Sequence, residues 1–129
     1  MTRPRVLVVE DDPNMRGLLQ VLLDTEGYDV ATASDGLAGL SQAAQTAPQL
    51  ILLDLNMPDL GGLRVLEQLR DDPGLAGTPV LVVTGQVDAV PVVARLLGDD
   101  CVLLKPFAVA DLLERVEQVT GGPGPEAGR

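Results

Sequence analysis

The chain has 129 residues, enough for one domain that buries roughly two-thirds of its unfolded surface. Its formal net charge is −10 and 2% of its residues are aromatic, which argues against a nucleic-acid surface built from basic and stacking side chains. One cysteine and no histidine exclude a disulfide framework and disfavour zinc or copper sites. No apolar run approaches ~20 residues and no signal-peptide pattern is present, so we expect a cytoplasmic protein without membrane contact.

Five short apolar segments, rich in leucine or β-branched residues, predict five strands. The third carries a single carboxylate, Asp54, at its end, and a run this apolar is typical of a strand buried on both faces. The predicted strands cover residues 5–10, 28–33, 50–54, 80–84 and 102–104.

Each strand is followed by apolar residues at helical spacing. The first helix has Asp12 at its N-cap, Pro13 at its first position and Gly27 at its end. In the fourth, Pro91 is tolerable only within the first turn. The other stripes run from Leu37 to Ala44, over 63–70, over 90–97 and from Val109 to Val116.

Strands and helices alternate strictly, which predicts an α/β fold with a parallel sheet, helices on both faces and right-handed crossovers. Residues 1–120 form the predicted domain. The tail at 121–129, GGPGPEAGR, is expected to be disordered because it cannot pack a core.

Polar residues follow four of the five strands. Asp11 and Asp12 follow the first, Asp54 ends the third, Thr84 ends the fourth, and Lys105 follows the fifth. In a parallel sheet these ends open on one edge, so we expect the side chains to converge there. Three carboxylates in one crevice repel each other unless a cation joins them, and an all-oxygen set suits Mg²⁺ or Mn²⁺.

The remaining groups suit an anion. Lys105 provides a point charge, Thr84 a hydroxyl donor, and Gly85 allows a backbone N–H to approach closely. An aspartate can accept a phosphoryl group covalently, and a metal with a lysine would neutralise its charge. Each feature also has a plain structural explanation, such as a helix cap or a solvated lysine. Their coincidence at four strand ends, with Lys105 the only lysine in the chain, favours a site.

Four motifs, VVEDDP, LLDLNMPDLGG, VVTG and LLKPF, occur in an order and spacing that resemble the receiver domain of bacterial two-component response regulators. Chemotaxis-type single-domain regulators are included in this resemblance, which covers about residues 5–120. It implies a flavodoxin-like, doubly wound (βα)5 fold whose five-stranded parallel sheet has the order 2-1-3-4-5.

The resemblance also implies a metal site. Asp12 matches the direct Mg²⁺ ligand and Asp11 its water-mediated partner. Asp54 supplies a further ligand, and the backbone carbonyl of Asn56 completes the set. Pro58 and Gly62 match residues that shape the loop after Asp54.

In the family, Asp54 matches the phosphoacceptor, which takes its phosphoryl group from a phosphohistidine of a sensor kinase or phosphotransfer protein. Thr84 matches the switch hydroxyl, Lys105 the lysine that contacts the phosphoryl group, and Pro106 a proline usually preceded by a cis peptide. The implied function is a phosphorylation-dependent switch that changes a protein-binding surface. The protein would not be an enzyme, and slow hydrolysis of its own aspartyl phosphate would be the only reaction beyond phosphoryl acceptance.

The chain departs from the family pattern at Val102, where an aromatic residue usually reports the state of the switch threonine. We therefore expect the signal to pass through the fourth helix and its loop. The downstream target is a protein of unknown identity, nucleic-acid binding by this domain is not expected, and homodimerisation through the fourth helix, fifth strand and fifth helix is possible.

Two alternatives remain open. A phosphatase or mutase resembling the haloacid dehalogenase family would also use an Asp nucleophile, but its acidic pair comes last in the chain and it needs a substrate cap. A degenerate receiver would act as a constitutive binding module without phosphorylation. Turnover of a phosphomonoester would favour the first, and signalling unaffected by Asp54→Asn the second.

Overall fold

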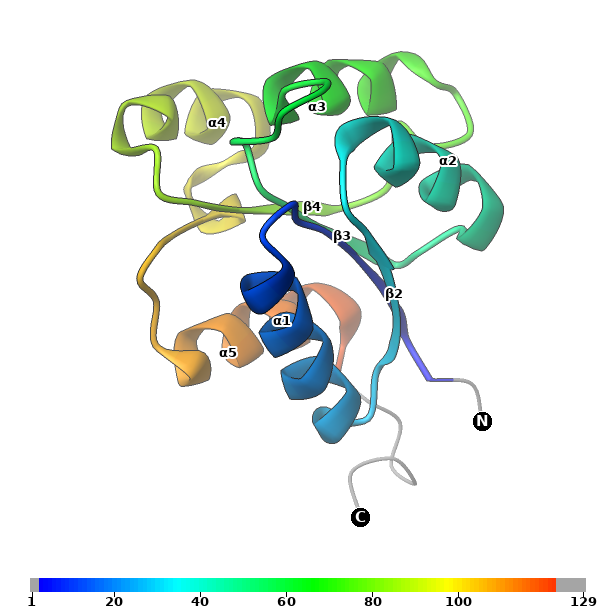
Figure 1. Ribbon diagram of the computed structural model, residues 1–129, viewed down its shortest axis with the longest axis vertical. Helices are drawn as coiled ribbons and strands as arrows, with labels where there is room; N and C mark the ends of the chain where they lie inside the picture. Colours follow the sequence, from blue (N-terminus) through cyan, green and yellow to red (C-terminus); the bar gives the residue numbers. More distant parts are fainter. Residues whose placement is uncertain (1–2, 123–129) are drawn as a thin grey trace.

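A single parallel sheet with helices on both faces forms the core of the protein (Figure 1). The computed structural model describes residues 3–122, and the tail predicted at 121–129 lies outside them from residue 123 onward. The strand order is β2-β1-β3-β4-β5, which confirms the predicted flavodoxin-like fold. The strands are β1 (Arg5–Val9), β2 (Asp29–Ala33), β3 (Leu50–Leu53), β4 (Val80–Thr84) and β5 (Val102–Leu104).

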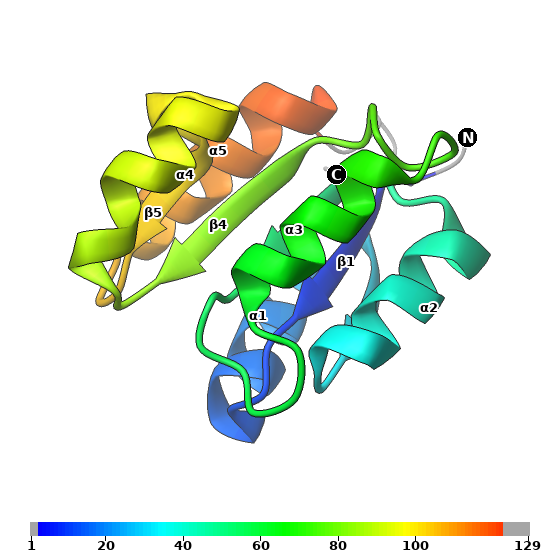
Figure 2. The ribbon, with the colours of Figure 1, turned by 90° about the horizontal axis from the view of Figure 1, so that it is seen from above.

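The helices lie in two layers (Figures 1 and 2). Helices α1 (Pro13–Glu26) and α5 (Val109–Thr120) cover one face of the sheet. The other face is covered by α2 (Gly36–Thr46), α3 (Gly62–Asp71) and α4 (Val90–Leu97). Two short 3-10 turns, η1 (Val87–Ala89) and η2 (Asp99–Cys101), flank α4.

Side chains of the central strands alternate between two hydrophobic clusters, as the period of two of a strand requires. Val6 and Val8 of β1 pack with residues of α1 and α5, such as Leu19 and Leu112. Leu7 of β1 packs on the opposite side, in the cluster that contains residues of α2, α3 and α4. Both faces of the sheet are therefore apolar, which explains why the strands are near-continuous hydrophobic runs.

The helix termini form for the predicted local reasons. The Asp12 carboxylate accepts a hydrogen bond from the backbone N–H of Asn14 at 3.1 Å, and α1 ends at Gly27 with a φ of 105°. Pro91 lies within the first turn of α4, as expected. Within residues 3–122, no helix is long and apolar enough to cross a membrane.

Some boundaries differ from the predictions by one residue. Strand β1 ends at Val9 rather than Glu10, β2 begins at Asp29, and β3 ends at Leu53. Glu10 and Asp54 are thus the first residues beyond two neighbouring strands, since Val9 pairs with Leu53 in the register of β1 and β3.

Candidate functional site

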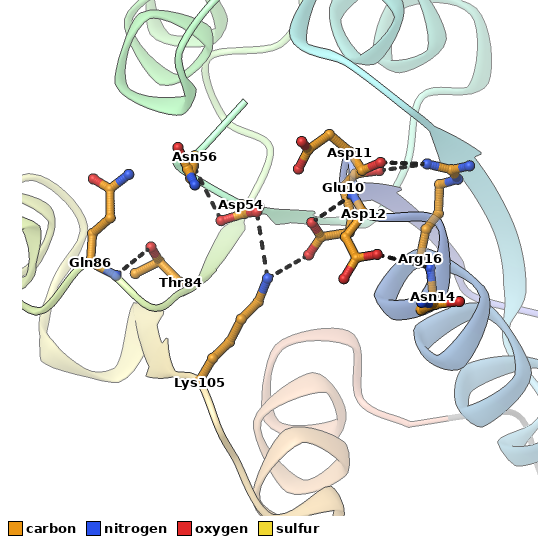
Figure 3. A network of polar contacts seen from close by, with 10 residues as sticks. All are labelled: Glu10, Asp11, Asp12, Asn14, Arg16, Asp54, Asn56, Thr84, Gln86 and Lys105. Atoms are coloured by element: carbon orange, nitrogen blue, oxygen red, sulfur yellow. Dashed lines mark hydrogen bonds and ion pairs between the residues drawn. The ribbon is translucent and has the colours of Figure 1, made fainter. Parts of the chain in front are cut away.

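The carboxyl ends of β1, β3, β4 and β5 bring polar side chains to one edge of the sheet (Figure 3). The backbone N–H of Asp54 donates to the carbonyl of Val9 at 3.1 Å, and that of Lys105 donates to the carbonyl of Thr84 at 2.8 Å. Parallel pairing thus continues one residue past the strands. It places Asp54 beside the end of β1 and Lys105 beside the end of β4.

The alternation of strand side chains decides which polar residues face each other. Glu10, Asp54 and Lys105 each come two positions after a residue that packs toward α1 and α5, namely Val8, Leu52 and Leu103. All three side chains therefore continue on the same side of the sheet. This period explains why Glu10, which the sequence analysis did not select, lies in the site.

Lys105 bridges two buried carboxylates. Its Nζ lies 2.7 Å from Oε1 of Glu10 and 3.5 Å from Oδ2 of Asp54. The side chains of Glu10 and Asp54 are only 2% and 7% exposed, whereas that of Lys105 is 22% exposed. Because charges buried in this way are costly unless paired, the lysine compensates the two acids in the absence of another cation.

Three acids form a group that could hold a metal ion. One carboxylate oxygen from each of Glu10, Asp11 and Asp54 lies within 4.8 Å of the others. Glu10 and Asp54 are buried, while Asp11 is open to solvent. An all-oxygen set with an open side fits Mg²⁺ or Mn²⁺, which retain bound water, better than a thiophilic metal.

The acid group differs from the pair expected at the end of β1. Asp12 is not a member of the group that the structure brings together, and Glu10 takes the second place beside Asp11. The physical reason is local: Asp12 is the N-cap of α1, and its Oδ1 is bonded to the N–H of Asn14. Its carboxylate therefore caps the N-terminus of α1.

The electrostatics of the group follow from burial and crowding. Burial, together with the neighbouring Asp54 carboxylate, raises the pKa of Glu10 to about 7, although the hydrogen bond from Lys105 opposes the change. Burial lowers the pKa of Lys105, but its bonds to Glu10 and Asp54 outweigh burial, and the net pKa is raised. The lysine therefore stays charged, and it is the one ammonium group beside a cluster of three carboxyl groups.

Arg16 is a second residue that sequence reasoning missed. Its Nη1 donates to the backbone carbonyls of Glu10 and Asp11, at 3.0 and 3.2 Å. One guanidinium on α1 thus fixes the backbone of both acids, as Figure 3 shows. Its position one helical turn after Asp12 is the only signal in the sequence that could have indicated this contact.

The remaining expected residues line the same edge. The N–H of Asn56 donates to Oδ1 of Asp54 at 3.2 Å. Thr84 is fully buried, and its hydroxyl oxygen accepts a hydrogen bond from the N–H of Gln86 at 3.0 Å. A Cβ added at Gly85 would meet nothing within 4 Å, so the space beside this backbone is open. The Lys105–Pro106 peptide is cis, as the resemblance implied.

Comparison with known proteins shows which family has this arrangement of residues. The family model of the response regulator receiver domain matches residues 6–117. The chain belongs to the response regulator receiver domain family. The matched residues contain all four motifs of the sequence analysis.

Individual relatives agree with this assignment. The receiver is 39% identical over 115 residues to the DNA-binding response regulator MtrA of Mycolicibacterium smegmatis, covering 88% of this chain and 49% of that protein. It is 41% identical to the DNA-binding dual master transcriptional regulator RpaA of Synechocystis, covering 88% and 47%. The chain thus spans about half the length of the curated relatives it matches.

Among solved structures, the chemotaxis response regulator CheY4 of Vibrio cholerae superimposes on this receiver with a TM-score of 0.82. The sequences are 29% identical, and the match covers 92% of this chain and 99% of that one. The receiver therefore shares the fold of chemotaxis-type receivers, and a phosphorylation switch is the general function of the family. Receiver domains are phosphoacceptors that interact with histidine kinases or phosphotransfer proteins.

Proposed function

We propose that Asp54 is the phosphoacceptor of a two-component signalling switch. The observation that carries this proposal is the surroundings of its carboxylate. Oδ2 lies 3.5 Å from the only lysine of the chain, Oδ1 accepts from the Asn56 N–H, and two further acids stand close by. A nucleophilic oxygen thus lies between an ammonium group and a group of oxygens suited to a cation.

The reaction is a phosphoryl transfer from a phosphohistidine. A carboxylate oxygen of Asp54 attacks phosphorus and forms an O–P bond, while the N–P bond breaks and the imidazole nitrogen takes its electron pair and then a proton. Lys105 and the hydroxyl of Thr84 stabilise the charge on the phosphoryl oxygens. Water later attacks the same phosphorus atom, which releases inorganic phosphate and restores the carboxylate.

Mg²⁺, with Mn²⁺ as a substitute, fits the donors present. Asp11, Asp54 and the backbone carbonyl of Asn56 would hold the ion, with Glu10 close to its bound water. When bound, the cation neutralises the transferred phosphoryl group and the crowded acids. In this proposal Asp11 has the direct-ligand part that the sequence analysis gave to Asp12, and Glu10 has the water-mediated part that it gave to Asp11.

The partners follow from this chemistry. A sensor kinase or phosphotransfer protein supplies the phosphohistidine, and we place this exchange in the cytoplasm. The modified receiver changes a surface that another protein recognises and performs no turnover reaction beyond its own slow dephosphorylation. The DNA binding named for the relatives belongs to those longer proteins, and homodimerisation stays a prediction.

The proposal is tested by incubating the protein with acetyl phosphate and Mg²⁺ and measuring intact mass. We expect one phosphoryl group on the wild type, none without the cation, and none on Asp54→Asn. Many turnovers on a phosphomonoester would instead identify a phosphatase, and labelling that persists in Asp54→Asn would refute the role of Asp54.

A further inference from the structure

The loop between β3 and α3, residues 54–61, contacts the start of α2 through one carboxylate. Oδ1 of Asp59 accepts from the N–H of Gly36 at 3.0 Å, and Oδ2 accepts from the N–H of Leu37 at 3.1 Å. These are two of the backbone donors that the first turn of a helix leaves without partners. The two bonds also hold the pKa of the Asp59 carboxyl below its usual value.

Asp59 binds a neighbouring helix although the loop leads into another one. Helix α3 begins after Gly61, and no side chain caps it. Helix α2 already has its own cap, since Oδ1 of Asp35 accepts from the N–H of Ala38 at 2.8 Å. Asp59 therefore binds two further N–H groups at the start of α2, and these two bonds join the loop to that helix.

Close packing on both sides shows how little freedom the loop has. A Cβ at Gly36 would lie 2.6 Å from the carbonyl oxygen of Leu60, so α2 begins directly against the loop. A Cβ at Gly62 would lie 2.4 Å from Cα of Leu55 and 2.6 Å from the carbonyl oxygen of Asp54. Two contacts hold the loop. The Gly62 N–H donates to the Leu55 carbonyl and so joins the two ends of the loop, and Asp59 holds the segment between them against α2.

We propose that Asp59 is a positioning residue, which holds the loop against α2 and thereby fixes Asn56 relative to Asp54. This inference rests on the proposed function, because Asn56 matters as a donor of the cation site. The carboxylate acts only through the backbone it anchors and does not contact the reacting atoms. Removing it should loosen the segment between Leu55 and Gly61 and weaken cation binding.

The test compares Asp59→Ala with Asp35→Ala in the full chain. Each variant removes one negative charge and a cap of the same helix, but only Asp59 lies on the loop. We expect Asp59→Ala to weaken Mn²⁺ binding, measured by calorimetry, by about tenfold, as for other residues that orient metal ligands. Asp35→Ala should stay within about twofold of the wild type, since exposed charges at a distance are screened. Asp59→Asn, which keeps one acceptor oxygen, should fall between them.

A second readout needs no metal. In the metal-free protein the amide resonance of Asn56, whose N–H donates to Asp54, should shift or broaden in Asp59→Ala and stay unchanged in Asp35→Ala. Equal effects of both variants on Mn²⁺ affinity and on this resonance, or no effect of either, would overturn the inference while leaving the proposed function standing. A wild type that neither binds Mn²⁺ nor is labelled at Asp54 would overturn both.

Discussion

The two halves of the carboxyl edge of the sheet are built differently. The acid half consists of the side chains that follow β1, β3 and β5, and Lys105 ties it together through ion pairs with Glu10 and Asp54. The β4–α4 half consists of Thr84 and the segment that follows it, and the Thr84 side chain has one hydrogen bond, accepted by its hydroxyl from the Gln86 N–H. The residues proposed for phosphoryl transfer are therefore held in place by ion pairs. Thr84 and helix α4 beside them have fewer contacts that hold them.

The helices that adjoin the two halves differ in the same way. Helix α1 has a side-chain cap, a proline at its start and a glycine at its end. Helix α4 has eight residues, no side-chain cap and a single buried residue, Val93. Val92 and Leu96 of α4 are 43% and 61% exposed. A short, weakly anchored helix has the low local stability from which conformational switches are drawn.

The largest effect should come from removing the charge that ties the acid half together. Lys105→Met eliminates the ammonium group that faces Asp54, so we expect acetyl phosphate labelling to slow by about a hundredfold or more. Lys105→Arg, which keeps the charge with a different shape, should retain part of the rate. A Lys105→Met rate within a few fold of the wild type, in protein that circular dichroism shows to be folded, would contradict the role of the lysine.

The pair Glu10 and Asp11 of the acid group predicts a contrast between neighbouring residues. Glu10→Gln should weaken Mg²⁺ binding by about tenfold, because Glu10 belongs to the acid group. Asp12→Asn should change it by less than about twofold and leave stability intact, because Asn is an equally good N-cap. Calorimetric titration of both variants decides between them. The reverse order of effects would restore the pair Asp11 and Asp12 expected from the sequence.

The free energy of unfolding should depend on pH, because Glu10 is buried close to another acid of the site. The pKa of Glu10 rises from 4.5 to about 7 on folding, so the folded state binds the extra proton. Stability from this group is complete below pH 4.5 and is lost as the pH rises to about 7, a change of up to about 3 kcal/mol in unfolding free energy.

Thermal or urea unfolding in a chelator, across this pH range, checks the prediction. The difference between wild type and Glu10→Gln isolates the contribution of Glu10 from other titrating groups. The wild type should lose stability relative to the variant as the pH rises. A constant difference between the two proteins would show that Glu10 titrates normally.

The last prediction concerns a conformational change in the β4–α4 half, which is smaller than the effects on labelling, cation binding and stability. Val102 replaces the aromatic residue usual in the family, so we expect a phosphoryl mimic to perturb amide resonances mainly between Gly85 and Leu97. Beryllofluoride with Mg²⁺ is a suitable mimic, and the remote segment of α2 near Thr46 serves as the internal reference. Absence of changes between Gly85 and Leu97 would refute signalling through α4.

Much of the fold could be predicted from sequence because local signals agreed with one another. Strands β4 and β5 were predicted with the boundaries that the structure has. Pro79 and Gly85 delimit β4, and β5 directly precedes Lys105–Pro106. The cap at Asp12 and the stop at Gly27 were also predicted correctly. The 3-10 turns η1 and η2 were missed, because three-residue turns carry no periodic pattern.

The sequence analysis expected Asp54, Thr84 and Lys105 at one edge of the sheet, and the structure has them there. For the acids after β1 it selected Asp11 and Asp12, whereas the structure groups Glu10 and Asp11 with Asp54. Asp12 was chosen over Glu10 because adjacent acids after a strand look equivalent in sequence. Counting by twos from Val8 would have placed Glu10 on the face shared by Asp54 and Lys105. The contacts of Arg16 and Asp59 could not be predicted, since they depend on how a helix start and a loop approach in space.

The central claim is that the phosphoryl group resides on Asp54, and mapping the modified residue tests it most directly. The protein is labelled with acetyl phosphate and Mg²⁺, and borohydride then reduces the acyl phosphate of an aspartate to homoserine, which peptide mass spectrometry locates. The account predicts homoserine at position 54 alone. Reduction at Asp11 or Asp12, or no reduced residue in a protein that binds the cation, would contradict it.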